Sequence, residues 1–116
     1  MEDRLMQQLK KGVLELLVLQ AVCRGSTYGY RLLSIIREQS GGLFTLREGT
    51  LYPILYRLED EGLIRSSWSP AEGRAAPKKM YQATEAGVLR LQRYRQMWNE
   101  VSETVNDFLQ EGDQIQ

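Results

Sequence analysis

Residues 45–68, TLREGTLYPILYRLEDEGLIRSSW, contain a change of hydrophobic period that decides the fold. Apolar residues first recur every three or four positions, which is typical of a helix running to Glu61, and Gly62 stands where helices commonly end. The period then changes to two, which indicates a strand. The residues on one face of that strand would be Ile64, Ser66 and Trp68.

The start of this helix allows two interpretations. Thr45 and Glu48 form a Ser/Thr-x-x-Glu capping box, in which each side chain would satisfy a free backbone amide of the first turn. Pro53, however, removes a backbone hydrogen bond from the interior of a helix. The helix therefore either begins near Thr50, so that Pro53 falls in its first turn, or begins near Arg47 and is locally distorted. We favour the start near Arg47.

Two more helices are expected before this stretch. The first spans Glu2–Arg24, where apolar residues keep helical spacing up to a glycine. Ser26 or Thr27 would cap the second helix, which would run through about Ser40 to a pair of glycines. Three consecutive helices thus precede the strand.

A loop, a second strand and a long helix are expected after it. Residues 69–77 are rich in proline, glycine and alanine and are too many for a tight turn, so this loop should project as a flap. The period of two returns over Lys78–Ala83. Thr84 would cap a last helix that continues to Glu111, a length of about 40 Å at 1.5 Å per residue.

The last helix carries an apolar stripe with spacings of 3, 4, 3, 4 and 3 residues. Its members are Leu91, Tyr94, Trp98, Val101, Val105 and Phe108. This heptad pattern is typical of helices that pair, and a second copy of the chain is the simplest partner. Leu5 and Leu9 of the first helix would join that dimer interface. The alternative is that the last helix folds back on its own domain.

This order of elements is that of a winged helix-turn-helix with one added helix. We expect a mainly α fold with a small two-stranded β wing. Residues 1–83 would form the DNA-binding domain, and residues 84–116 the dimerisation helix with its tail. In such a module the third helix lies in the DNA major groove, and the wing reaches the backbone or the minor groove.

Several short motifs of the chain resemble the PadR family of bacterial transcriptional regulators. They are Tyr28-Gly29-Tyr30, Gly49–Ile64, Gly73-Arg74, Lys78–Tyr81 and Thr84–Gly87. The match extends from about Leu9 to Gly87, and its specific part is the string from Gly49 to Leu63. A single helix after the wing is similar to the short subfamily of PadR-like regulators. The resemblance implies a homodimer that represses transcription.

Cationic and hydroxyl side chains predict where DNA would be bound. Between Gly62 and Trp98 there are seven basic residues and two acidic ones, although the net charge of the chain is zero. The candidate DNA-binding residues are Tyr28, Tyr30, Arg47, Thr50, Tyr52, Pro53, Arg57, Arg74, Lys78 and Lys79. Their cations would neutralise phosphates, and their hydroxyls would bind phosphate oxygens. A solvated charged loop without a partner is the alternative for the wing, and a core position is the alternative for Tyr28.

Trp98 lies in the middle of the apolar stripe, where a compact interface usually has Leu or Val. Members of the short subfamily that bind flat aromatic compounds use a tryptophan of this helix at the dimer centre, and the resemblance assigns that role to Trp98. A planar aromatic ligand would stack on the indole. The side chains that would complete this site are Val13, Leu16, Met97 and Glu100. The alternative is that Trp98 simply packs in the interface.

Other classes of function are disfavoured by the composition. The chain has no His, which argues against Ser-His-Asp catalysis and most zinc sites, so we expect neither an enzyme nor a metal or cofactor. Glu59-Asp60-Glu61 is interpreted as a solvated helix end. The single Cys23, with no signal peptide and no run long enough to cross a membrane, indicates the cytoplasm. The alternative function is a protein-interaction adaptor without specific DNA binding.

Overall fold

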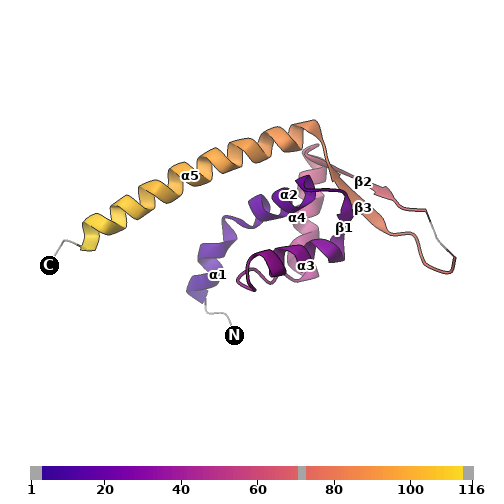
Figure 1. Cartoon of the computed structure of the whole chain (residues 1–116), viewed down its shortest axis with the longest axis horizontal. Coiled ribbons are helices and arrows are strands. Elements are labelled where there is room, and N and C mark those ends of the chain that lie inside the picture. Colours follow the sequence, from indigo (N-terminus) through magenta and orange to yellow (C-terminus); the bar gives the residue numbers. More distant parts are fainter. Residues whose placement is uncertain (1–3, 71–72, 114–116) are drawn as a thin grey trace.

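The computed structural model describes residues 4–70 and 73–113, with the side chains of 111–113 left aside. The elements are α1 (Arg4–Lys11), α2 (Leu14–Cys23), β1 (Thr27–Tyr28), α3 (Gly29–Gln39), α4 (Glu48–Asp60), β2 (Ile64–Trp68), β3 (Lys79–Ala83) and α5 (Glu85–Asp113). The expected helix start at Glu2 and the tail at 114–116 lie outside the described residues. Figure 1 shows a head of short helices from which the β2–β3 hairpin projects on one side and α5 on the other.

The expected mainly helical fold with a small wing and a long last helix is confirmed. The sheet, however, has three strands in the order β1-β3-β2 and not two. The expectation that Thr27 or Ser26 caps α3 is wrong, because Thr27 and Tyr28 pair with Tyr81 and Met80 of β3. Tyr28 precedes α3 in an extended conformation, without a side-chain capping bond.

The prediction of one helix over Glu2–Arg24 is also wrong. The chain forms α1 and α2, which are separated by Gly12 and Val13. Glycine disfavours a helix interior. Burial does not counter this preference, since α1 contains no buried residue.

The start of α4 near Arg47 is confirmed, but the capping box is not formed. Arg47 is the N-cap residue and makes no side-chain capping bond. Thr45 instead donates its hydroxyl to the carbonyl of Gly42 at 3.0 Å. Pro53 lies inside the helix with an exposed side chain.

The start of α5 is fixed by Thr84, as expected. Its hydroxyl accepts the Gly87 N–H at 3.1 Å and donates to the carbonyl of Gly62 at 2.7 Å. The helix then continues to Asp113, two residues past the expected end.

The hydrophobic core of the head lies between α2, α3, α4 and the inner face of the sheet. Its fully buried side chains include Leu19, Leu32, Leu55 and Tyr81. Leu91 of α5 also belongs to this core, with an exposed fraction of 6%. The first turns of α5 are therefore part of the head, and the rest of the helix extends away from it (Figure 1).

Candidate nucleic-acid interface

Helix α4 presents one apolar face to the core and the opposite face to solvent. Leu51, Leu55 and Leu58 are buried without exposed surface. Because residues three or four apart share a helix face, the intervening Pro53 and Tyr56 point outward, and Tyr56 is 53% exposed. Helix α4 thus has a free ridge that a groove of DNA could receive.

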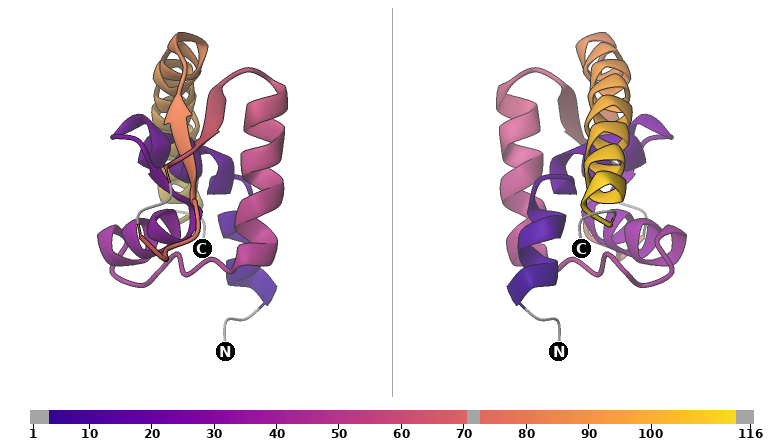
Figure 2. Two further views of the ribbon diagram at one scale, coloured as in Figure 1. Left: turned by 90° about the vertical axis from the view of Figure 1, so that its right-hand side faces the viewer. Right: turned by 90° about the vertical axis from the view of Figure 1, so that its left-hand side faces the viewer.

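The wing, of which the structure describes β2, residues 69–70, residues 73–78 and β3, flanks this ridge. Viewed along the hairpin, α4 lies on one side of it and α3 on the other (Figure 2). Ser66 of β2 donates its hydroxyl to the carboxylate of Glu59 on α4 at 2.6 Å. This bond ties the base of the wing to α4.

Lys78 lies on the α3 side of the wing, over two tyrosines. The rings of Tyr28 and Tyr30 are stacked, with centroids 5.7 Å apart and planes within 4°. The Lys78 ammonium lies 5.0 Å from the Tyr28 centroid and 5.4 Å from that of Tyr30, and donates to the Tyr30 hydroxyl at 3.4 Å. Attraction between the cation and the ring faces holds the ammonium at an exposed position.

Lys79 lies on the α4 side of the wing, between Tyr56 and Tyr81. Its ammonium is 5.8 Å from the Tyr56 centroid and 5.7 Å from that of Tyr81. Tyr56 in turn contacts Tyr52, with ring centroids 6.3 Å apart. We refer to the six residues Tyr28, Tyr30, Tyr52, Tyr56, Lys78 and Lys79 as the Lys-Tyr surface.

The buried tyrosine beneath Lys79 remains neutral. Burial, reinforced by Tyr52, Tyr56 and Glu59 nearby, raises the pKa of Tyr81 to about 12. The side chain of Tyr81 is only 1% exposed. Lys79 therefore meets the face of a buried, uncharged ring.

Tyr52 is placed by a close approach to the start of α3. A Cβ atom built on Gly29 would lie 2.5 Å from the Tyr52 hydroxyl oxygen, so any other residue at this position would displace the Tyr52 ring. The Tyr-Gly-Tyr motif thus supplies both the stacked pair and the space into which Tyr52 fits.

Four of the candidate DNA-binding residues lie away from the Lys-Tyr surface. Arg47 and Thr50 line a cavity of about 280 Å³ with Lys10 and Lys11 at the other end of α4. Arg74 is exposed in the wing loop. Arg57 is turned toward α2, where its Nε lies 3.7 Å from a carboxylate oxygen of Glu15.

Glu15 also accepts a hydrogen bond from the hydroxyl of Tyr94 on α5. Burial and this carboxylate raise the pKa of Tyr94, and Arg90 opposes the shift. The group formed by Arg57, Glu15 and Tyr94 therefore joins α4, α2 and α5. The Arg57 side chain remains 61% exposed in this contact, whereas Tyr94 packs against the core.

Tyr56 was missed among the sequence candidates. It lies one helical turn after Tyr52, and this i, i+4 spacing is the signal that could have identified it.

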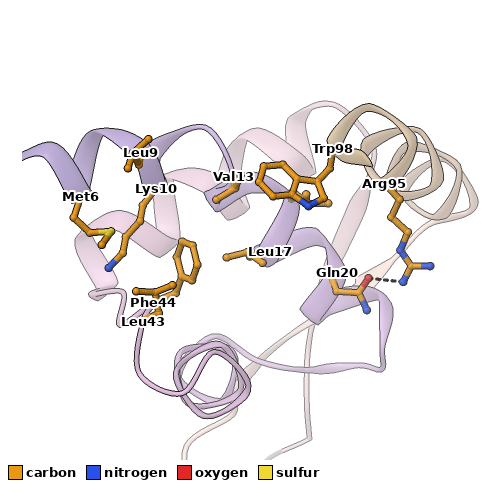
Figure 3. A pocket seen from close by; sticks show the side chains of 11 residues that line it. Met6, Leu9, Lys10, Val13, Leu17, Gln20, Leu43, Phe44, Arg95 and Trp98 are labelled. Carbon is orange, nitrogen blue, oxygen red and sulfur yellow. Dashed lines mark hydrogen bonds between the residues drawn. The ribbon is translucent and has the colours of Figure 1, made fainter. Parts of the chain in front are cut away.

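An apolar cavity of about 510 Å³ lies on the opposite side of α2, between α1, α2, the α3–α4 connection and α5. Trp98 extends over it from α5, and Phe44 and Leu43 line the facing wall (Figure 3). Arg95 donates to the side-chain oxygen of Gln20 at 2.7 Å at one end. The candidate ligand residues Val13, Leu16 and Trp98 line this cavity, whereas Met97 and Glu100 do not.

The apolar stripe of α5 has two parts. Leu91 is buried in the head and Tyr94 packs against its core. Beyond them, the side chains of Trp98, Val101, Val105 and Phe108 are between 49% and 75% exposed. Leu5 and Leu9 of α1 are 69% and 70% exposed. The free part of the stripe thus begins at Trp98.

Other chemistry finds little support in the described part of the chain. Within it, no group of three or more His, Cys, Asp or Glu side chains is placed to hold a metal ion. No helix there combines the length and apolar character that crossing a membrane requires. Cys23 is partly buried against the core, which raises the pKa of its thiol despite the opposing charge of Arg95.

The chain is similar in sequence to known transcriptional regulators over most of its length. Residues 18–93 match the model of the transcriptional regulator PadR-like family. The chain is 31% identical to the transcriptional regulator Rv3488 of Mycobacterium tuberculosis over 100 residues, which cover 86% of this chain and 89% of that protein. It is 30% identical to the negative transcriptional regulator PadR of Bacillus subtilis over 95 residues, which cover 82% of this chain but 52% of that protein.

The fold is likewise shared with solved structures. A PadR family transcriptional regulator from Eggerthella lenta superposes with a TM-score of 0.80 at 30% identity, over 90% of this chain and 88% of the other. Residues 18–93, which match the family model, include α4, both wing strands and the first turns of α5. Because the family model covers more than half of the sequence, the chain belongs to the PadR-like family of transcriptional regulators, whose members are not enzymes.

Proposed function

We propose that the protein is a homodimeric repressor that binds a twofold DNA operator in the cytoplasm. Helix α4 enters the major groove, and the wing lies on the backbone or minor groove beside it. The observation that carries this proposal is the Lys-Tyr surface, in which two wing cations are held over tyrosine rings next to the free ridge of α4. Such fixed cations suit phosphate oxygens, which dominate the affinity of proteins for DNA.

The dimer would form through α5 and α1. The free part of the stripe, from Trp98 to Phe108, is an exposed apolar face that a second copy of α5 can cover. Two heads related by a twofold axis would place their α4 helices in successive grooves. Operator half-sites are then spaced by about 34 Å or a multiple of it.

The proposal is tested by fluorescence-anisotropy titration of a duplex from the protein's own upstream region at two salt concentrations. We expect tight binding that weakens with salt, and weaker binding to an unrelated duplex. The double variant Lys78→Ala/Lys79→Ala should lose affinity about 10- to 100-fold at low salt. The negative slope of log affinity against log salt should become less steep by about two per head, because each removed phosphate contact reduces its magnitude by about one.

A matched control removes two exposed cations from elsewhere on the head. Arg24→Ala/Arg37→Ala changes the net charge equally and should leave the salt slope near that of the wild type. Equal effects of the two double variants would show that only net charge matters. Absence of salt-sensitive binding to any duplex would instead favour a protein-interaction adaptor.

We further propose that a planar aromatic molecule binds the cavity beneath Trp98 and releases the DNA. The cavity is almost entirely apolar at its walls and is large enough for a fused-ring compound of drug size. It lies between α2 of the head and α5 of the dimer arm. A ligand there weakens DNA binding to the extent that it prefers one orientation of these two helices.

Trp98→Ala tests this site. An acridine dye titrated in the absence of DNA should bind the variant about 10- to 100-fold more weakly, because the stacking face is lost. Light scattering must show that the variant is still a dimer. Unchanged dye binding would contradict the site, and dissociation of the dimer would show that Trp98 acts as an interface residue.

A further inference from the structure

We propose that Trp68, at the outer end of β2, is a contact to the DNA backbone that extends the Lys-Tyr surface along the wing. This inference rests on the proposed operator binding. It assigns a role to a side chain outside the sequence candidates.

The register of the hairpin places Trp68 on the face of the wing that looks toward α4. Trp68 pairs with Lys79, and Ser66 pairs with Tyr81, so these four side chains share one face. Ser66 on this face bonds to α4, and the Lys79 ammonium lies over Tyr56 of α4. Trp68 is therefore two residues further out along β2 than Ser66 and is paired with Lys79 on the face of the wing that looks toward α4.

The position of Trp68 is fixed although its side chain is not buried. The next residue, Ser69, donates its backbone N–H to the Lys78 carbonyl at 2.8 Å and accepts the Lys78 N–H on its hydroxyl at 3.1 Å. The ladder is thus held on both sides of the Trp68–Lys79 pair. The indole nevertheless is 69% exposed, more than that of Trp98 at 49%. A large apolar side chain that is exposed to water adds little to the stability of the head.

The charges around Trp68 select DNA as its partner. Residues 64–83 contain four cations, Arg65, Arg74, Lys78 and Lys79, and a single carboxylate. An apolar protein partner would leave these cations without counter-charges. A DNA strand instead offers phosphates to the lysines, deoxyribose carbons to the indole face, and phosphate oxygens to the indole N–H, which can only donate.

The test compares the salt dependence of Trp68→Ala with that of Lys79→Ala. Anisotropy titrations use the upstream duplex and an unrelated duplex, starting at low salt. Trp68→Ala should weaken binding to both duplexes by about 5- to 20-fold without changing the salt slope, because no charge is removed. Lys79→Ala should make the negative salt slope less steep. Leu89→Ala removes a similarly exposed apolar side chain from α5, at 60% exposure, and should bind like the wild type.

Indole emission provides a second readout that does not depend on the stability of the alanine variant. Trp68 and Trp98 are the two tryptophans of the sequence. Either duplex should change the emission of the wild type, and most of the change should be absent in Trp68→Phe. Wild-type affinity in Trp68→Ala together with an emission change that persists in Trp68→Phe would overturn this inference alone. Failure of the wild type to bind any duplex at low salt would overturn the proposed function as well.

Discussion

Replacing Gly87 with alanine is expected to lower the free energy of unfolding by about 3 kcal/mol. A Cβ at this position would lie 2.0 Å from the carbonyl oxygen of Leu63 and 3.0 Å from its carbonyl carbon. Both are backbone atoms, and the same carbonyl accepts the Thr84 N–H at 3.1 Å. Relief of the clash therefore requires that the start of α5 move away from β2, which breaks this junction.

Gly49→Ala is the matched control for this substitution. Gly49 also lies in the first turn of a helix, and a Cβ there would meet nothing within 4 Å. The control should be neutral or gain up to about 1 kcal/mol, because alanine favours the helix. Urea unfolding followed by circular dichroism compares the two variants. Equal midpoints would contradict the close packing of α5 on Leu63.

This junction has a functional consequence. Leu91 and Tyr94 anchor the same segment of α5 in the head, and Glu15 links Tyr94 to Arg57 of α4. The direction in which the free part of α5 leaves the head is thus set by contacts that also involve α4. A change at the start of α5 would therefore alter the direction in which the free part of the helix leaves the head.

Elements with local signals could be predicted from the sequence. The strand over Ile64–Trp68, the Thr84 cap and the end of α4 before Gly62 all depend on residues a few positions apart. At Thr84 the hydroxyl meets the amide of Gly87 three residues later, within the first turn of α5.

The errors concern elements whose partners lie far away in the sequence. Two residues, Thr27 and Tyr28, become a strand only because β3 is placed beside them by the hairpin. Their sequence carries a stronger local signal for a helix cap. The capping box is a different case, because both of its alternatives are local: the Thr45 hydroxyl bonds to the carbonyl of Gly42, three residues before it, and not to the first turn of α4.

The candidate site shows the same limit. The spacing of Tyr52 and Tyr56 on one helix is visible in the sequence, whereas the contact of Lys78 with Tyr30 joins residues 48 positions apart. Arg57 stays a candidate phosphate ligand, and its contact with Glu15 could not be predicted because Glu15 lies on another helix. The heptad pattern also does not distinguish a position that packs in the core of the head from one that is exposed. Leu91 is the first kind and Val105 is the second.

Val105→Glu is expected to keep the protein monomeric and to weaken operator binding at least about 100-fold. Val105 is 50% exposed in the middle of the free stripe, with Val101 and Phe108 on the same face. Two copies of α5 that pair there would bury a carboxylate from each chain, and an unpaired buried charge is costly. A monomer then holds a single half-site and loses the gain in effective concentration that a linked second head provides.

Gln110→Glu adds the same charge to an exposed position on the other side of α5 and should remain a dimer with normal affinity. Sedimentation equilibrium and anisotropy titration together separate the possible reasons for a loss of binding. A Val105→Glu protein that stays dimeric would show that α5 pairs through another face. A monomer that binds the operator as tightly as the wild type would show that one Lys-Tyr surface with one α4 suffices, so the twofold operator would have to be abandoned while DNA binding by the head stands.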